Sequence, residues 1–444
     1  MRIVSLALML SAVLGGALPA QEEKKERHVV LISIDGLRPE FYLGDGFDAP
    51  TLKAMAKEGA SAKAVESVYP SVTYAGHASI VTGVRPWRHG VVANTKFGEN
   101  GGTQEWFWET KDLKAKTVWQ LAHDAGRKTA ITAWPSSVGA QVDWLVPERW
   151  AVFKGETTEG LLGKHSTPGL LAEMALAIGV PKGENLKSKE VMDEFISSGA
   201  AYVLRKYKPH LLLVHLIQVD EAQHNFGRDA PEVHAAVKAT DANVAKIRKG
   251  AELAGILDRT DFVIVGDHGF ADAGEALAPN TLLASAGLLD ADGTKVKSWK
   301  ALGHAHGGSM AVYAKDADSA KMAREVLEKG ATADGKRLYS ILDRRQLDDL
   351  GYNSAAALAL EAEDGFMFAS TSKGSLTGHK PWSKGQHGHL PTKPKLATGF
   401  IASGPGIRRV LIERMRVIDV APTVAAMLGL EMKEVEGAKL DIIE

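Results

Sequence analysis

Short apolar runs bounded by turn residues alternate along this chain with longer segments of helical periodicity. The runs at 28–34, 211–217 and 261–265 are almost continuously apolar, which is typical of strands buried on both faces of a parallel sheet. Further strands are predicted at 129–133, 309–313 and 397–402, and helices at 51–58, 118–125, 191–206, 232–254, 319–328, 354–363 and 420–428. The alternation predicts an α/β fold, with a doubly wound, mainly parallel sheet flanked by helices.

One long stretch departs from this alternation. Residues 275–380 contain Gly-rich turns and a mixture of short strands and helices. We expect them to form an inserted, smaller α+β subdomain near the mouth of the functional site. The main domain would then consist of residues 28–274 and 381–444.

The first twenty residues have the composition of a signal peptide. Arg2 supplies a positive start, residues 4–14 are nearly all apolar, and small residues precede a polar run at 21–27. The apolar run is shorter than the roughly 20 residues that span a bilayer, so we predict cleavage after about Ala20 rather than a membrane anchor. The chain has no cysteine, which also rules out disulfides. We expect export to a periplasm or the extracellular space.

The overall composition is that of an ordinary soluble globular protein. Hydrophobic residues make up 45% of the 444 residues, charged residues 24%, and the formal net charge is −1. This balance gives no basis for a stable nucleic-acid complex or for attraction to a membrane surface. No G-x-G-x-x-G follows the first predicted strand, which argues against a dinucleotide-dependent oxidoreductase.

Acidic residues follow the three most apolar strands. Asp35, Asp220 and Asp267 each come directly after, or within a few residues of, a strand end. In open α/β sheets, ligands bind just outside the carboxyl ends of the strands. Three carboxylates gathered at that edge would repel one another without a cation between them, so the pattern predicts a metal centre.

Histidines accompany these carboxylates. Asp220 and His224 are four residues apart and would share one face of a helix, Asp267 is followed by His268, and His387 lies in a glycine-flanked loop. Oxygen and nitrogen donors without sulfur suit Zn²⁺ best, with Mn²⁺ or another divalent ion also possible. We expect the remaining histidines near the motifs to be structural or to line the rim; they are His77, His89, His304, His306 and His389.

Ser71 and Thr73 precede a segment of small residues that resembles a helix start. Either hydroxyl could simply cap that helix. Alternatively, a hydroxyl at a helix N-terminus beside a metal can be ionised, and can present a phosphoryl group to the free backbone N–H groups.

Together these motifs resemble the nucleotide pyrophosphatase/phosphodiesterase family of the alkaline phosphatase superfamily. Besides the segment around Thr73, the matches are 33–38 (SIDGLR), 79–83 (SIVTG), 88–94 (RHGVVAN), 134–135 (WP), 220–224 (DEAQH), 267–269 (DHG) and 385–388 (GQHG). They occur in family order over essentially the whole mature chain. The resemblance implies an alkaline-phosphatase-like fold and a small-molecule phosphodiester or nucleotide substrate.

The resemblance also assigns roles to individual residues. It implies two divalent metal ions, Zn²⁺ foremost, one held by Asp35, Thr73, Asp267 and His268, the other by Asp220, His224 and His387. Thr73 would be the nucleophile, and a phosphothreonyl intermediate would separate two displacements. Asn94 and the backbone N–H after Thr73 would donate to a non-bridging phosphate oxygen.

The chain also departs from its relatives near the nucleophile. Many have Lys before it and Phe-Pro-Asn-His after it, whereas this chain has Val72 before Thr73 and Tyr74 after it. Tyr74 could stack on a nucleobase or aryl group, or pack in the interior; Trp150 and Phe153 are further candidates for such a surface. The residues around Thr73 are neutral and no Lys-x-Arg pair follows Trp134-Pro135, so we expect diesters to be preferred over monoesters.

Other functions remain open at this point. A phosphate monoesterase or phosphonate hydrolase could use the same metal pair. A sulfatase is disfavoured, because that branch uses a modified Cys or Ser and the chain has no Cys. A catalytically idle, secreted metal-binding protein is the alternative from another class, although such relatives usually lose a ligand or the nucleophile.

Overall fold

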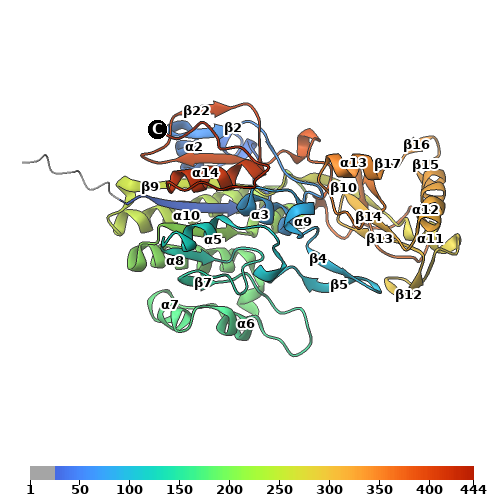
Figure 1. Ribbon diagram of the computed structural model, residues 1–444, viewed down its shortest axis with the longest axis horizontal. Helices are drawn as coiled ribbons and strands as arrows, with labels where there is room; N and C mark the ends of the chain where they lie inside the picture. The colour runs from blue at the N-terminus through green and yellow to red at the C-terminus, as the bar shows by residue number, and fades with distance from the viewer. Residues whose placement is uncertain (1–25) are drawn as a thin grey trace, which may run out of the picture.

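The computed structural model describes residues 26–444, so the predicted signal peptide lies outside the described residues. An eight-stranded sheet forms the centre of the molecule (Figure 1). In spatial order its strands are β22 (Val410–Ile412), β2 (Ala60–Ala62), β21 (Phe400–Ser403), β9 (Thr260–Val265), β1 (His28–Ile34), β8 (Leu211–Leu216), β6 (Thr129–Thr132) and β7 (Trp144–Val146). The run from β9 to β7 is parallel, and β21 pairs antiparallel with β9. The predicted doubly wound, mainly parallel sheet is confirmed.

Strand β1 shows why its sequence is apolar throughout. All of its residues are buried, and alternate side chains enter two different hydrophobic clusters. Val29 and Leu31 pack on the face covered by α3 (Thr73–Thr82), α5 (Val118–Asp124) and α14 (Val420–Met427). The opposite face is covered by α2 (Pro50–Glu58), α8 (Lys189–Tyr207) and α10 (Pro231–Leu253). The strand is therefore buried on both faces, as the sequence predicts.

A second body of structure lies to one side of this sheet (Figure 1). It has a four-stranded sheet and a three-stranded sheet, both separate from the central one, and a hydrophobic cluster of its own. Its elements are β10 (Ala271–Leu277), α11 (Asn280–Ser285), β11 (Leu289–Asp292), β12 (Lys295–Trp299), β13 (Ala301–Ala305), β14 (Ser309–Ala314), α12 (Ala317–Gly330), β15 (Thr332–Ala333), β16 (Lys336–Arg337), β17 (Tyr339–Leu342), α13 (Arg344–Asp349), β18 (Leu358–Ala362), β19 (Gly365–Phe368) and β20 (Gly385–Gln386). Its mixture of helices and strands matches the expected α+β character of this stretch.

Shorter elements complete the described chain. They are α1 (Glu40–Leu43), β3 (Val65–Glu66), α4 (Pro86–His89), β4 (Thr95–Gly98), β5 (Gly101–Trp106), α6 (Thr158–His165), α7 (Leu170–Ile178), α9 (Gln218–Phe226) and β23 (Met415–Arg416). Within residues 26–444, no helix is both long enough and apolar enough to cross a bilayer.

One predicted element is wrong. The alanine-rich segment 354–363 was expected to be helical, but residues 358–362 form strand β18 between β14 and β17. Alanine favours helices in isolation, yet every residue of β18 is buried and its backbone is paired on both sides. The tertiary pairing thus overrides the local propensity.

Candidate metal centre

The carboxyl ends of three adjacent parallel strands bring the predicted ligands together. β1 lies between β8 and β9, so Asp35, which follows β1, lies beside Asp267, which follows β9. β8 leads directly into helix α9, which carries Asp220 and His224. The sheet order therefore places residues from distant parts of the chain at one edge, as expected for an open α/β sheet.

Asp35, Asp267 and His268 form what we call the buried half of the centre. His268 Nε2 lies 3.2 Å from Asp35 Oδ1 and 3.2 Å from Asp267 Oδ2. All three residues are at most 2% exposed. One ligand atom from each lies within 4.8 Å of the others, which is close enough for one ion to contact all three.

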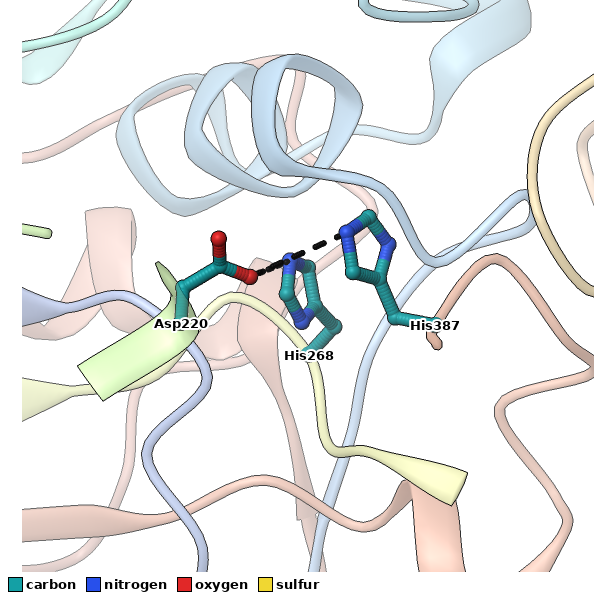
Figure 2. A group of neighbouring side chains, drawn as sticks. All are labelled: Asp220, His268 and His387. Carbon is teal, nitrogen blue, oxygen red and sulfur yellow. Dashed lines mark ion pairs between the residues drawn. The ribbon is translucent and has the colours of Figure 1, made fainter. Parts of the chain in front are cut away.

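Asp220, His224 and His387 form the rim half. Asp220 Oδ1 lies 3.4 Å from His224 Nε2 and 3.8 Å from His387 Nε2. Figure 2 shows Asp220 and His387 together with His268, whose Nε2 is 4.0 Å from the same oxygen. The side chains of Asp220 and His224 are each 15% exposed, so this half opens towards solvent. His268 stands between the two halves and is near enough to contribute to both.

Buried Asp193 fixes the helix that carries the rim half. Its two carboxylate oxygens accept hydrogen bonds from the backbone N–H groups of Ile217 and Gln218, at 2.8 and 3.0 Å. These groups belong to the first turn of α9, where an acidic side chain is favourable. Asp220 and His224 then lie one turn apart on the same face, as their spacing predicts.

The ligand histidines are oriented by backbone carbonyls. His224 Nδ1 donates to Gly385 O at 2.9 Å, His387 Nδ1 to Ser71 O at 3.0 Å, and His268 Nδ1 to Gly269 O at 3.3 Å. A carbonyl can only accept, so each ring carries a proton on Nδ1 and turns its Nε2 towards the centre. This arrangement is usual for histidines that bind metals.

Several atoms that face the centre have no hydrogen-bond partner among residues 26–444. They are Asp35 Oδ1, Asp220 Oδ1, Asp267 Oδ2 and His268 Nε2, and all four are buried. Unpaired buried polar atoms are costly, and a cluster of them implies a missing partner. Divalent cations satisfy these oxygen and nitrogen donors, so the residues fit the metal ions that the sequence predicts.

The pKa values of these groups reflect their burial and the charges close to them. Burial opposes ionisation of Asp35, but the hydrogen bond from His215 and the positive charges of His268 and His215 hold its pKa well below the usual value. Burial and the neighbouring Asp35 charge raise the pKa of Asp220 well above its usual value. Burial lowers the pKa of His224 to about 4, and burial with the His268 charge lowers that of His387. Both rim histidines are therefore neutral at pH 7, the form that binds metals.

Thr73 occupies the first position of helix α3, beside the buried half. The helix can approach because Gly76 has no side chain: a Cβ there would lie 2.9 Å from Asp267 Cβ. The N-cap of α3 is Val72, which provides no side-chain cap, and Ser71 Oγ instead donates to His389 O. Neither hydroxyl caps the helix, so the capping interpretation of Ser71 and Thr73 is wrong.

Asn94 also lies at this helix start. Its Oδ1 accepts a hydrogen bond from the Tyr74 N–H at 2.9 Å. The amide oxygen is thereby used, and the NH₂ group of Asn94 is the part left to donate to a ligand. The Tyr74 N–H, expected to donate beside it, is engaged by Asn94 in this structure.

The Tyr74 side chain faces the interior. It is fully buried, its ring packs edge-on against Trp106 and Trp108, and its hydroxyl donates to Glu148 at 2.7 Å. The ring has no free face, so of the two roles expected for Tyr74 the structure supports packing, not stacking on a substrate. Trp150 packs edge-on against Trp106 and Trp108 in the same cluster.

The structure adds two residues that the sequence analysis missed. His215, in the middle of β8, lies 3.1 Å from Asp35 Oδ2 through Nε2 and 2.6 Å from Glu148 through Nδ1. A buried chain of hydrogen bonds therefore links Tyr74, Glu148, His215 and Asp35. Burial disfavours a charged ring, but Glu148 and Asp35 outweigh it and raise the pKa of His215 well above its usual value. The one feature of the sequence that could have indicated this buried network was a histidine inside an otherwise apolar strand.

The other histidines near the motifs make structural contacts, and His77 lies directly against the buried half. Its Nδ1 is 3.4 Å from Asp267 Oδ2 and 2.8 Å from Thr73 O. His89 Nε2 lies 2.9 Å from Ser79 Oγ. His389 pairs with buried Glu361 at 3.0 Å, and Glu361 also accepts from Leu390 N. Glu361 belongs to β18, so the second body of structure holds the loop that carries His387. His304 and His306 pack against each other on the β13–β14 turn.

The sequence matches a known family and known relatives. The model of the type I phosphodiesterase / nucleotide pyrophosphatase family matches residues 29–390. Human ectonucleotide pyrophosphatase/phosphodiesterase family member 1 is 24% identical over 255 residues, which are 54% of this chain and 23% of that protein. The bis(5'-adenosyl)-triphosphatase enpp4 of Xenopus laevis is 23% identical over 252 residues, 55% of this chain and 47% of that protein. This chain thus spans less than half the length of either relative.

Solved structures share the fold. Human ectonucleotide pyrophosphatase/phosphodiesterase 5 matches with a TM-score of 0.67 and 18% identity, covering 93% of this chain and 97% of that one. An inactive variant of the murine protein in complex with AMP matches with a TM-score of 0.66 and 16% identity, covering 93% and 98%. The central sheet, its flanking helices and the second body of structure are therefore a known architecture.

Proposed function

This chain belongs to the type I phosphodiesterase / nucleotide pyrophosphatase family, and we propose that it is a two-metal hydrolase that cleaves phosphate diesters or nucleotide pyrophosphate bonds. One observation carries the proposal. Two groups of carboxylate and imidazole atoms share His268 and converge beside the helix start that presents Thr73. A catalytically idle protein would not need Thr73, Asn94 and both sets of predicted metal ligands together.

Two divalent ions, Zn²⁺ foremost, would be held by Asp35, Thr73, Asp267 and His268 and by Asp220, His224 and His387. When bound, such ions neutralise phosphate charge and lower the pKa of coordinated oxygens. Two relatives support a nucleotide substrate: the murine protein that was solved in complex with AMP, and the protein named bis(5'-adenosyl)-triphosphatase.

The residues at the start of α3 would perform the chemistry. The Thr73 Oγ–H proton passes to solvent as Oγ bonds to phosphorus, and the bond from phosphorus to the leaving oxygen breaks, with its electron pair staying on that oxygen. Water then attacks phosphorus, the bond from phosphorus to Thr73 Oγ breaks, and the proton that the water loses restores the Thr73 hydroxyl. The Asn94 NH₂ group donates to a non-bridging oxygen, and the first turn of α3 adds a favourable dipole for the negative charge.

The surroundings of Asn94 favour a substrate with two substituents. A cleft of about 510 Å³ is lined by both chain neighbours of Asn94, Ala93 and Thr95, and by Phe97 and Phe107. Lys96, the cation nearest to Asn94 in sequence, is paired with Glu105 at 2.7 Å and with Asp112 at 3.0 Å. Its charge is thus balanced by these two carboxylates and is not free to meet the second negative charge that a monoester would bring.

The testing experiment compares matched aryl diester and monoester substrates with the Zn²⁺-loaded enzyme. We expect a higher kcat/KM for the diester and loss of both activities after chelation. A clear monoester preference would transfer the assignment to a phosphatase on the same metal pair. A nucleotide pyrophosphate and a phosphonate monoester complete the panel. The predicted signal peptide supports export to a periplasm or beyond.

A further inference from the structure

The rim half of the metal centre carries an exposed tryptophan. Trp382 is 65% exposed, and its ring centroid lies 5.3 Å from that of His224, at an interplanar angle of 37°. Trp87, Phe153 and Phe226 are also exposed, but within residues 26–444 only Trp382 among these four has its ring against a predicted ligand ring. A single exposed aromatic side chain is common on a protein surface and needs no explanation. An exposed aromatic ring that packs on a predicted metal ligand does need one.

Trp382 is held in place by the backbone around it. Lys384 N donates to His224 O at 2.7 Å, and His224 Nδ1 donates to Gly385 O at 2.9 Å. Ser383 between them is buried, and its hydroxyl donates to Gly385 O at 2.8 Å. The segment that carries the tryptophan is thus fastened to the end of α9, which limits the entropy lost when a ligand packs on the ring.

The direction of the reaction identifies what would meet this ring. In-line displacement puts the leaving oxygen opposite the attacking oxygen of Thr73. Thr73 stands against the buried half through Gly76 and Asp267, so the leaving oxygen faces the rim half. Whatever the leaving oxygen carries then extends towards His224 and the Trp382 ring.

We infer that Trp382 is a stacking surface for an aromatic leaving group, such as a nucleobase-bearing or aryl alcohol. The inference rests on the proposed function and extends it to substrate selection. Aromatic rings gain from offset or edge contacts with a large flat indole, and a tryptophan fixed in advance favours such contacts. Trp382 takes the role that the sequence analysis considered for Tyr74, which is buried.

Three substrates distinguish contacts to the leaving group from contacts to the substituent that stays on phosphorus. Methyl p-nitrophenyl phosphate has an aromatic leaving group, methyl diphosphate has none, and thymidine diphosphate has its aromatic ring on the retained side. In Trp382→Ala we expect KM for the first to rise roughly 5- to 20-fold with little change in kcat. The other two substrates should change by less than about twofold, since stacking is removed on the leaving side only.

Variants control for indirect effects. Trp382→Phe should restore most of the affinity because it keeps an aromatic face. Trp87 is also exposed, at 54%, but its ring does not pack on a predicted ligand, so Trp87→Ala should change nothing. Metal content should be the same in all variants. Equal effects on all three substrates, no effect at all, or an effect confined to thymidine diphosphate would overturn the inference. A metal-loaded wild-type enzyme that turns over none of them would instead overturn the proposed function.

Discussion

The two halves of the metal centre differ in how the protein supports them. In the buried half, Asp35 is held by His215, and behind it Glu148 and Tyr74 continue the hydrogen bonds into the core. In the rim half, the two histidines are held by backbone carbonyls, and the side chains of Asp220 and His224 reach solvent. The half beside Thr73 is therefore set in a network of polar side chains, whereas the other half lies on helix α9 and on the loop that carries His387, with its histidines held by backbone carbonyls.

The two halves would therefore have different functions in the proposed mechanism. Low exposure strengthens electrostatic interactions and fixes geometry, which suits the half that positions Thr73. The open half can admit leaving groups of different size and the water that completes the cycle. Predictions that separate the halves therefore test the proposed mechanism most directly.

The largest effect is expected at Thr73, the proposed nucleophile. Thr73→Ala should lower kcat by several orders of magnitude, because the neighbouring Ser71 and Tyr74 hydroxyls are hydrogen-bonded to His389 O and Glu148 and cannot replace the Thr73 hydroxyl. Thr73→Ser should keep measurable activity through its own hydroxyl. Rapid-quench kinetics with a labelled diester should detect the phosphothreonyl species in wild type. Near-normal turnover by Thr73→Ala would mean that water attacks directly.

Matched glutamine variants compare the halves through their metal content. His268 is near both groups of ligands, whereas His224 belongs to the rim half alone. We expect His268→Gln to lose both ions after dialysis and His224→Gln to keep about one, as elemental analysis would measure. Equal losses in the two variants would show that the halves bind their ions as one unit.

Asn94→Ala should reduce kcat by about 10²- to 10³-fold, the usual cost of one lost donor to a developing oxyanion. The metal content should be unchanged, because Asn94 contacts the backbone of Tyr74 and not a ligand residue. A variant that loses metal as well as activity would show that Asn94 supports the centre rather than the substrate.

The network behind Asp35 gives a smaller and more specific prediction. Glu148→Gln keeps the shape of the side chain but removes its charge, and it should weaken metal binding by about 10- to 100-fold. Competition with a chromogenic chelator would measure this change. Tyr74→Phe removes only the outermost hydrogen bond and should have a lesser effect. If both variants bind metal like wild type, the buried network has no role in holding the ion.

The smallest prediction concerns stability. Burial lowers the pKa of His89, which hydrogen-bonds to α3 through Ser79, from 6.5 to about 3. Between those values the unfolded chain binds a proton that the folded chain excludes, so stability from this group is complete above pH 6.5 and falls as pH falls. Its loss between pH 6.5 and 5 should be about 2 kcal/mol.

Metal-free protein is the right sample for that measurement, because acid also releases the ions. In denaturant unfolding experiments, the free energy of unfolding of His89→Asn should fall less between pH 7 and 5 than that of the wild type does. His123→Asn, at a half-exposed position, serves as the matched control and should follow the wild-type slope. Parallel slopes for all three proteins would contradict a neutral, buried His89.

Much of the fold was predictable from the sequence. The central strands have continuous apolar runs, because they are buried on both faces, and the helices between them keep a helical period. The α+β character of residues 275–380 followed from their mixed pattern. The error at 358–362 arose because six consecutive alanine or leucine residues, 355–360, favour a helix locally, while the partners β14 and β17 lie elsewhere in the chain.

The sequence by itself determined which residues gather at the functional edge. Asp35, Asp220, Asp267 and His268 sit in short motifs after strands of the central sheet, and parallel strands deliver their ends to one edge whatever the details of packing. Only the tertiary structure decided that His215 and Glu148 stand behind Asp35, that Tyr74 points inward, and that Trp382 lies over His224. Those contacts join side chains separated by long stretches of sequence, and they depend on which faces the packed core leaves free, which no local pattern encodes.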